Sequence, residues 1–187
     1  MAAGDDVLAD LRKEAEGTLT AMRREMARTR TGRASTALLE GITVDYYGAK
    51  TPLNQLASLG APEPRLLVIQ PYDRSAVNDI ERAILQSDLG LVPQNDGKLI
   101  RVPIPELTEE RRRDLVKVIK HEGENAKVAV RNLRRDANHA LKELLKSKGV
   151  SEDQERRAQE EIQKLTDKHI ADIDKMIAAK EAELIAV

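Results

Sequence analysis

The sequence of 187 residues contains no cysteine, which excludes disulfide bonds, thiolate zinc sites and a cysteine nucleophile. Tryptophan and phenylalanine are also absent, and the aromatic residues are Tyr46, Tyr47 and Tyr72. A platform of aromatic rings that stacks on single-stranded bases is therefore not expected, and contact with nucleic acid must depend on charge. No apolar run approaches the ~20 residues that a membrane span needs, so we expect no membrane partner.

Proline is missing from long stretches at both ends of the chain. All seven prolines lie between Pro52 and Pro105. Because proline is excluded from helix interiors, the flanks can form long helices and the middle cannot. The pattern predicts a middle segment inserted between helical flanks.

Apolar residues at steps of three and four predict amphipathic helices on the flanks, at residues 5–32, 108–148 and 151–187. We expect Asp5 or Asp6 to cap the first helix, and Ser151 with Gln154 forms a capping-box pattern at the start of the third. The short link between the second and third helices makes them antiparallel neighbours, and the first helix completes a three-helix bundle. At ~1.5 Å per residue the second helix would be about 60 Å long, so the expected bundle is elongated.

The middle of the chain has strand-like runs at residues 42–47, 65–70 and 98–102, the last after an Asp96–Gly97 turn. Val77, Ile80 and Ile84 mark one short helix between the later runs. These elements predict a small β/α/β domain.

The predicted fold class is therefore α+β, an elongated three-helix bundle with an inserted small β/α/β domain. We assign residues 1–31 and 106–187 to the bundle and residues 34–103 to the inserted domain. Residues 30–34 and 103–105 would be paired hinge linkers, which resist stretching but can bend.

The formal net charge of −1 conceals a separation of charge along the chain. Residues 127–148 hold seven basic and two acidic side chains, whereas residues 151–187 hold six basic and ten acidic ones. Arg131, Arg134 and Arg135 share one helical face, which could contact several phosphates. A solvated surface, or a face that binds an acidic protein, explains the same charges.

Residue patterns of catalysis are missing. His121, His139 and His169 lack metal-ligand spacing, and we expect each to be an exposed or half-buried helix residue. No phosphate-binding glycine motif is present, so we expect no enzyme, no cofactor and no metal. Alternation places one of Tyr46 and Tyr47 in the core and the other in water, and leaves open which is which.

Six segments resemble the ribosome recycling factor family, in order and across nearly the whole chain. They are residues 30–34 (RTGRA), 45–48 (DYYG), 52–57 (PLNQLA), 87–91 (SDLGL), 107–112 (LTEERR) and 130–136 (VRNLRRD). The resemblance implies an L-shaped, two-domain, monomeric protein of the cytoplasm, which the absence of an arginine-rich leader also favours.

The resemblance also implies a function. After translation termination, such a factor binds the ribosome and, with elongation factor G and its GTP hydrolysis, separates the subunits for recycling. The factor is not a catalyst and has no DNA partner. Large-subunit ribosomal RNA would be bound by Arg30, Arg131, Arg134 and Arg135, and the hinge residues would be Arg33, Ala34, Pro103, Ile104 and Pro105.

Two positions depart from the family pattern. Ala37 and Glu106 stand where many relatives have proline, and both lie near the expected hinge. An alternative from another class is an elongated helical adaptor or chaperone that binds protein partners, which would require exposed apolar positions on the bundle.

Overall fold

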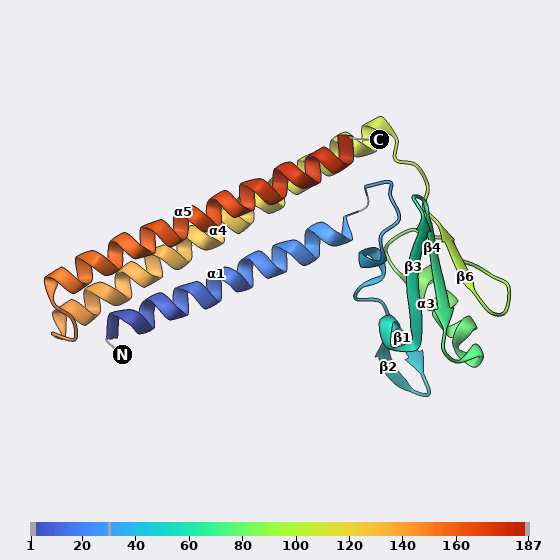
Figure 1. Ribbon diagram of the computed structural model, residues 1–187, viewed down its shortest axis with the longest axis horizontal. Helices are drawn as coiled ribbons and strands as arrows, with labels where there is room; N and C mark the ends of the chain where they lie inside the picture. The colour runs from blue at the N-terminus through green and yellow to red at the C-terminus, as the bar shows by residue number, and fades with distance from the viewer. Residues whose placement is uncertain (1–2, 30, 186–187) are drawn as a thin grey trace. The chain divides into compact units, whose positions relative to one another are not determined.

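The computed structural model describes residues 3–29 and 31–185, in two compact units (Figure 1). The first unit combines residues up to Met26 with residues from Arg113 onward, and the second comprises Ala27–Arg112. The second unit is thus inserted between the two halves of the first.

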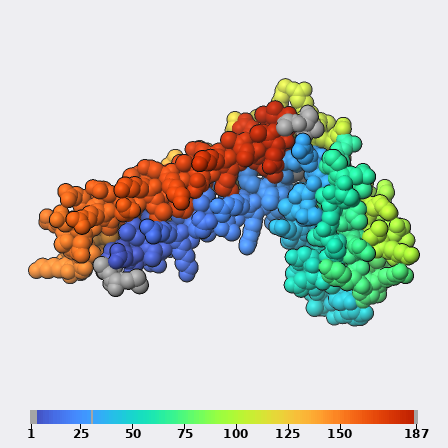
Figure 2. Space-filling model, in the orientation of Figure 1, coloured from blue at the N-terminus to red at the C-terminus, as the bar shows by residue number. Residues whose placement is uncertain are grey.

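The first unit is a bundle of three helices, α1 (Ala3–Arg28), α4 (Glu109–Lys146) and α5 (Glu152–Ile185). Figure 1 shows α4 running antiparallel to α1 and α5. In the space-filling view the side chains of α1 and α5 close the gap between their ribbons (Figure 2). The predicted fold class, a helical bundle with a small α+β domain, is confirmed.

Side chains cap the N-termini of two of the three bundle helices, α4 and α5. Thr108 Oγ1 accepts a hydrogen bond of 3.1 Å from the Arg111 N–H at the start of α4. The Ser151 N–H donates to Gln154 Oε1 over 2.9 Å, and the Gln154 N–H donates to Ser151 Oγ over 3.2 Å, so the predicted capping box is confirmed. The expected cap at Asp5 or Asp6 is wrong, because α1 begins at Ala3 and both carboxylates lie within its first turn.

Apolar side chains from all three helices form the bundle core, among them Leu11, Leu19, Ile119, Leu141, Ile162 and Ile173. Gly123 is buried where α4 meets α5, and a Cβ added there would overlap the Ile177 side chain. His169, expected to be at least half-exposed, is buried at 5% exposure. Its Nδ1 lies 2.8 Å from the Leu165 carbonyl oxygen, one helical turn earlier.

The second unit contains a four-stranded antiparallel sheet of order β3–β4–β6–β5 and a separate β1–β2 hairpin. Two 3₁₀ turns and two helices accompany the strands. In chain order the elements are η1 (Thr36–Leu39), β1 (Thr43–Tyr46), β2 (Ala49–Pro52), α2 (Leu53–Leu56), β3 (Ala57–Glu63), β4 (Leu66–Pro71), η2 (Arg74–Ala76), α3 (Val77–Gln86), β5 (Gln94–Asn95) and β6 (Ile100–Pro103).

Helix α3 packs against β1 and β5, and its predicted apolar residues Val77, Ile80 and Ile84 are buried. They join the inward residues of β4 and β6 in one core. The strands β2, β3 and β5 were not expected. β2 and β3 contain lysine, glycine and proline, which are uncommon in strands, and β5 has only two residues. A register shift between Gly60 and Glu63 accommodates Pro62 in β3, an edge strand.

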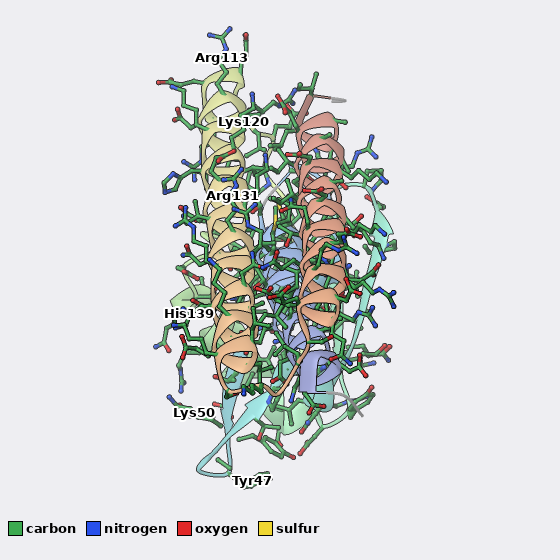
Figure 3. The ribbon with its side chains drawn as sticks, turned by 90° about the vertical axis from the view of Figure 1, so that its left-hand side faces the viewer. Tyr47, Lys50, Arg113, Lys120, Arg131 and His139 are labelled. Atoms are coloured by element: carbon green, nitrogen blue, oxygen red, sulfur yellow. The ribbon has the colours of Figure 1, made fainter. Side chains whose placement is uncertain are left out.

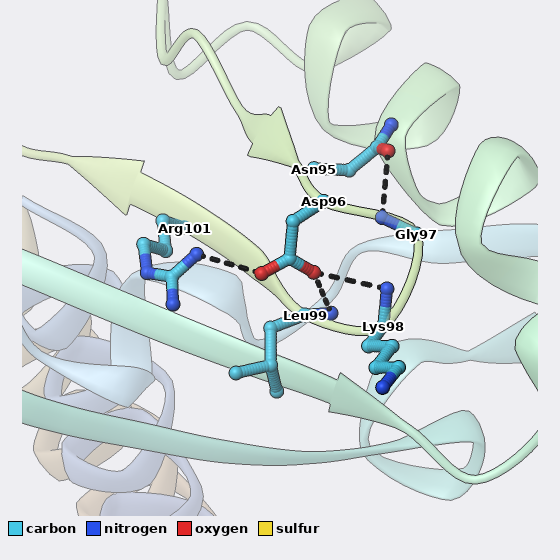
Figure 4. A network of polar contacts seen from close by, with 6 residues as sticks. All are labelled: Asn95, Asp96, Gly97, Lys98, Leu99 and Arg101. Atoms are coloured by element: carbon cyan, nitrogen blue, oxygen red, sulfur yellow. Dashed lines mark hydrogen bonds and ion pairs between the residues drawn. The ribbon is translucent and has the colours of Figure 1, made fainter.

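The predicted Asp96–Gly97 turn is present between β5 and β6 (Figure 4). One carboxylate oxygen of Asp96 accepts hydrogen bonds from the main-chain N–H groups of Lys98 (3.0 Å) and Leu99 (2.8 Å). The other oxygen accepts from the Arg101 side chain over 3.0 Å. These three bonds lower the pKa of Asp96 to about 2, and the bond from the Leu99 N–H is the largest cause.

Candidate nucleic-acid interface

The predicted arginine cluster lies in the middle of α4. Arg131, Arg134 and Arg135 are three and four residues apart and share one side of the helix. Figure 3 shows Arg131 on α4 between Lys120 and His139. The Arg135 side chain is exposed, and those of Arg131 and Arg134 are half-buried. Their aliphatic stems can therefore rest on the bundle while the guanidinium groups meet solvent or a partner.

None of these three arginines pairs with a carboxylate in the part of the chain that the structure describes. Some of the lysines before and after them on α4 do, whereas Lys117 and Lys142 have no ion pair within the described residues. Lys127 contacts Asp174 of α5 and lies 3.3 Å from Glu124, and Lys146 lies 2.9 Å from Glu143. The arginine cluster therefore places three cations without an ion pair within five residues of α4.

The pKa values of the paired groups reflect the same neutralisation. The hydrogen bond that Lys127 donates to Asp174 is the main cause that raises the pKa of Lys127, and the hydrogen bond from Lys146 lowers the pKa of Glu143. A charge that is already satisfied within the protein gains less from a phosphate than an unpaired one. The cluster at residues 131–135 is accordingly better suited to bind an anion than Lys127 or Lys146.

Arg30, the fourth predicted RNA-binding residue, lies outside the described residues. The linker residues that follow it belong to the second unit. Arg33 is exposed and Ala34 is half-buried, and the Ala34 N–H donates a hydrogen bond of 2.6 Å to the Pro64 carbonyl oxygen. The incoming chain is thus attached to the turn between β3 and β4.

The outgoing linker is attached to the same turn. Pro103 is the last residue of β6 and Ile104 is buried, with its N–H donating to the Arg65 carbonyl oxygen over 2.8 Å. Pro105 is exposed. Leu107, two residues beyond the outgoing linker, packs beside Gly32 of the incoming one, where an added Cβ would lie 3.8 Å from the leucine Cγ.

The two positions that depart from the family pattern both make local contacts. The Glu106 carboxylate pairs with the Arg65 side chain on the β3–β4 turn. The Ala37 N–H donates to Ser35 Oγ over 3.3 Å at the start of η1, a bond that proline could not make. The anchoring role of Pro64 and Arg65 had no signal in the sequence, because it arises from main-chain contacts.

The histidines of the described chain do not gather with acidic residues into a metal site. His121 and His139 are exposed, as expected, and lie on α4. No group of three potential ligands among histidine, aspartate and glutamate gathers within residues 3–29 and 31–185. No helix in those ranges is both long and apolar enough to cross a membrane.

The chain is by class a two-unit protein, a three-helix bundle with an inserted α+β unit, and its arginine face is suited to bind phosphate groups. Comparison with known proteins is more specific. The family model described as Ribosome recycling factor matches residues 22–185. The chain is 56% identical over 180 residues to the ribosome-recycling factor of Natranaerobius thermophilus, covering 96% of this chain and 98% of that relative.

Two further similarities lead to the same family. The ribosome-recycling factor of Halalkalibacterium halodurans is 57% identical over 182 residues, with 97% of this chain and 98% of the relative covered. A solution structure of the ribosome recycling factor matches with a TM-score of 0.82 at 44% identity, and both chains are covered completely. The chain belongs to the ribosome recycling factor family.

A second solved structure sets such a factor in context. It presents models for the T. thermophilus ribosome recycling factor and the E. coli elongation factor G bound to the E. coli post-termination complex. Its recycling-factor chain matches with a TM-score of 0.68 and 46% identity, over 98% of this chain and 99% of that one.

Proposed function

We propose that this protein is a translation factor that binds the post-termination ribosome and, with elongation factor G and GTP hydrolysis by that partner, separates the ribosomal subunits. Family membership over nearly the full chain supports this function. The related factor bound with elongation factor G to a post-termination complex supports the choice of partners. The factor itself performs no chemistry and acts in the cytoplasm, where it meets ribosomes.

In this proposal the arginine cluster of α4 holds large-subunit ribosomal RNA. The observation that carries it is that Arg131, Arg134 and Arg135 have no carboxylate partner among the described residues, whereas Lys127 and Lys146 of the same helix are paired. Arg30 joins them by its position in the family motif. Guanidinium groups bind phosphate oxygens in a planar fork, so the bundle recognises the shape of the RNA backbone and not its bases.

The two linkers supply the movable joint of the proposal. Residues 30–34 and 103–105 join the bundle domain, 1–31 with 106–187, to the inserted domain, 34–103. Ala34 and Ile104 are held at adjacent residues of one turn, which supports a hinge with a fixed end on the inserted domain. Arg33, Pro103 and Pro105 lie next to these fixed points, and a push on one domain would be transmitted as rotation.

The binding mechanism is tested by co-sedimentation of the protein with vacant ribosomes over a salt series. We expect Arg134→Ala to weaken binding and to lower the salt slope by about 1, because one phosphate contact releases about one counterion. Arg157→Ala is the matched control, since Arg157 is an exposed arginine of α5 outside the cluster. Equal slopes for wild type and Arg134→Ala would refute the phosphate contact.

The adaptor alternative has little support in the structure. Within the described part of the bundle, the exposed large apolar side chains are Val118, Val128 and Ile185. They come from two helices, and Val118 and Val128 point in different directions from α4, because ten residues make about 2.8 helical turns and leave the two side chains about 80° apart around the axis. They form no stripe to which a partner helix could bind.

A further inference from the structure

The turn between β5 and β6 contains Asp96 followed by Gly97, the one Asp–Gly pair in the sequence. Such a pair is chemically labile, because glycine has no side chain to keep a neighbouring carboxyl group away from its main-chain nitrogen. In the reaction the glycine nitrogen attacks the aspartate Cγ and forms a C–N bond. The carboxyl hydroxyl leaves as water together with the amide proton, and a succinimide ring remains.

Water then opens this ring in one of two directions. Attack at the side-chain carbonyl restores aspartate, whereas attack at the former main-chain carbonyl gives isoaspartate, in which the chain continues through Cγ and is longer by one carbon atom. Both Asp96 and Gly97 are exposed, and the Asp96 side chain is 48% exposed. Water therefore reaches the pair, and any protection must come from the hydrogen bonds of the turn.

The nitrogen that would attack is occupied by a hydrogen bond. The Gly97 N–H donates to Asn95 Oδ1 over 3.3 Å (Figure 4). The Asn95 side chain is itself held, because its Nδ2 donates to the Glu81 carboxylate of α3. Attack by the Gly97 nitrogen would first have to break the bond to Asn95.

The carboxyl group that would be attacked is held as well. The Asp96 carboxylate accepts from the N–H groups of Lys98 and Leu99 and from the Arg101 side chain, and all three bonds favour its ionised form. Ring closure requires the protonated acid, because the leaving oxygen departs as water. With a pKa of about 2 in place of 3.8, about 60-fold fewer Asp96 side chains carry a proton at neutral pH.

We propose that the Asp96–Gly97 turn is a latent site of isoaspartate formation, which the hydrogen bonds made by Asn95 and Arg101 keep from reacting in the folded protein. Isoaspartate at position 96 would carry its carboxylate directly on Cα, too short to reach the N–H groups of Lys98 and Leu99. The turn leads into β6, and β6 leads to the anchored Ile104. The protected bond thus lies on the path of the outgoing linker, and its chemistry is independent of the proposed function.

The first test compares the folded protein with the same chain unfolded in guanidinium chloride, both incubated at neutral pH. Isoaspartate is counted by methyl transfer from S-adenosylmethionine with an isoaspartyl methyltransferase, and it is located by electron-transfer mass spectrometry of the peptide that contains residues 96 and 97. We expect the rate at Asp96 to be lower by about tenfold or more in the folded protein. Equal rates in the two states would overturn the proposal.

The second test removes the two side chains of the network one at a time. Asn95→Ala frees the Gly97 N–H and Arg101→Ala removes the cation beside the Asp96 carboxylate, so each should raise the folded-state rate by about threefold or more. Arg82→Ala is the matched control, because Arg82 lies 3.8 Å from an aspartate of α3 in the same unit but makes no bond to the turn. Its rate should equal that of the wild type.

A third measurement separates opening of the turn from general loss of stability. Circular dichroism establishes that each variant is folded, and Gly123→Val, which overpacks the bundle and not the inserted unit, should keep the wild-type rate of isoaspartate formation. Wild-type rates for both Asn95→Ala and Arg101→Ala would refute the proposal. So would an increase of the same size in Arg82→Ala or Gly123→Val.

Discussion

The main-chain N–H of Ile104 donates a hydrogen bond of 2.8 Å to the carbonyl oxygen of Arg65. The Arg65 side chain in turn pairs with Glu106, two residues further along the outgoing linker. A main-chain bond beside a buried Ile104 side chain is less dependent on salt than an exposed ion pair. The linker is therefore fixed at Ile104 and more loosely held at Glu106.

This relationship predicts a small effect of removing the ion pair. The Arg65 and Glu106 side chains are 49% and 74% exposed, so Glu106→Ala should reduce the free energy of unfolding by less than about 1 kcal/mol. Urea unfolding at low and high salt measures it, and the difference between variant and wild type should shrink at high salt. A loss of several kcal/mol would mean that the pair, and not the bond at Ile104, anchors the linker.

The close approach of α4 and α5 at Gly123 leaves no room for a larger side chain. A Cβ there overlaps Ile177, so Gly123→Val should lower the free energy of unfolding by about 1–3 kcal/mol through overpacking. Thermal unfolding followed by circular dichroism measures the change.

Gly17 of α1 provides the matched control, because it is exposed and an added Cβ would meet nothing within 4 Å. Gly17→Ala should raise the free energy of unfolding by about 0.5–1 kcal/mol through helix propensity. Equal destabilisation by the two substitutions would contradict close packing at Gly123.

The lowered pKa of Asp96 predicts that the protein loses stability in acid. Its folded-state pKa of about 2 lies below the ordinary value of about 3.8, so its contribution to stability is present above that ordinary value and is lost as the pH falls toward 2. Urea unfolding between neutral pH and pH 2.5 should show a steeper acid loss for the wild type than for Asp96→Asn. Identical pH profiles would show that the bonds from Leu99, Lys98 and Arg101 do not lower this pKa.

The raised pKa of Tyr46 predicts that the protein also loses stability in alkali. The hydrogen bond to Asp73 is the main cause that raises the pKa of Tyr46 to about 12, so its contribution is present below pH 10 and is lost as the pH rises toward 12. Ultraviolet titration should reveal one tyrosine that ionises near pH 12, and Asp73→Asn should move that step to lower pH. An unmoved step would show that the hydrogen bond is not its cause.

Local sequence was sufficient for the helices and for the position of the arginine cluster. The long helices follow from apolar periodicity and from the absence of proline, which depend on neighbouring residues alone. The one-sided spacing of Arg131, Arg134 and Arg135 likewise needs only the helical repeat. That they lack acidic partners among the described residues could not be predicted, because a partner can come from another helix, as Asp174 of α5 does for Lys127.

The β-rich unit was harder to predict for the same reason. Strands β2 and β3 have weak local preference and are stabilised by pairing with β1 and β4. His169 lies on a helix whose periodicity was clear, yet its burial depends on how the three helices are packed together.

The sequence by itself determined the helical flanks, the inserted middle, the absence of cysteine chemistry and the motifs of the family, since all of these depend on residue type and spacing. The tertiary structure alone decided that both linkers attach to one turn, that Tyr47 and not Tyr46 faces solvent, and which cations remain unpaired. Each of these depends on contacts between residues distant along the chain, and such contacts are set by packing and backbone geometry that no local pattern encodes.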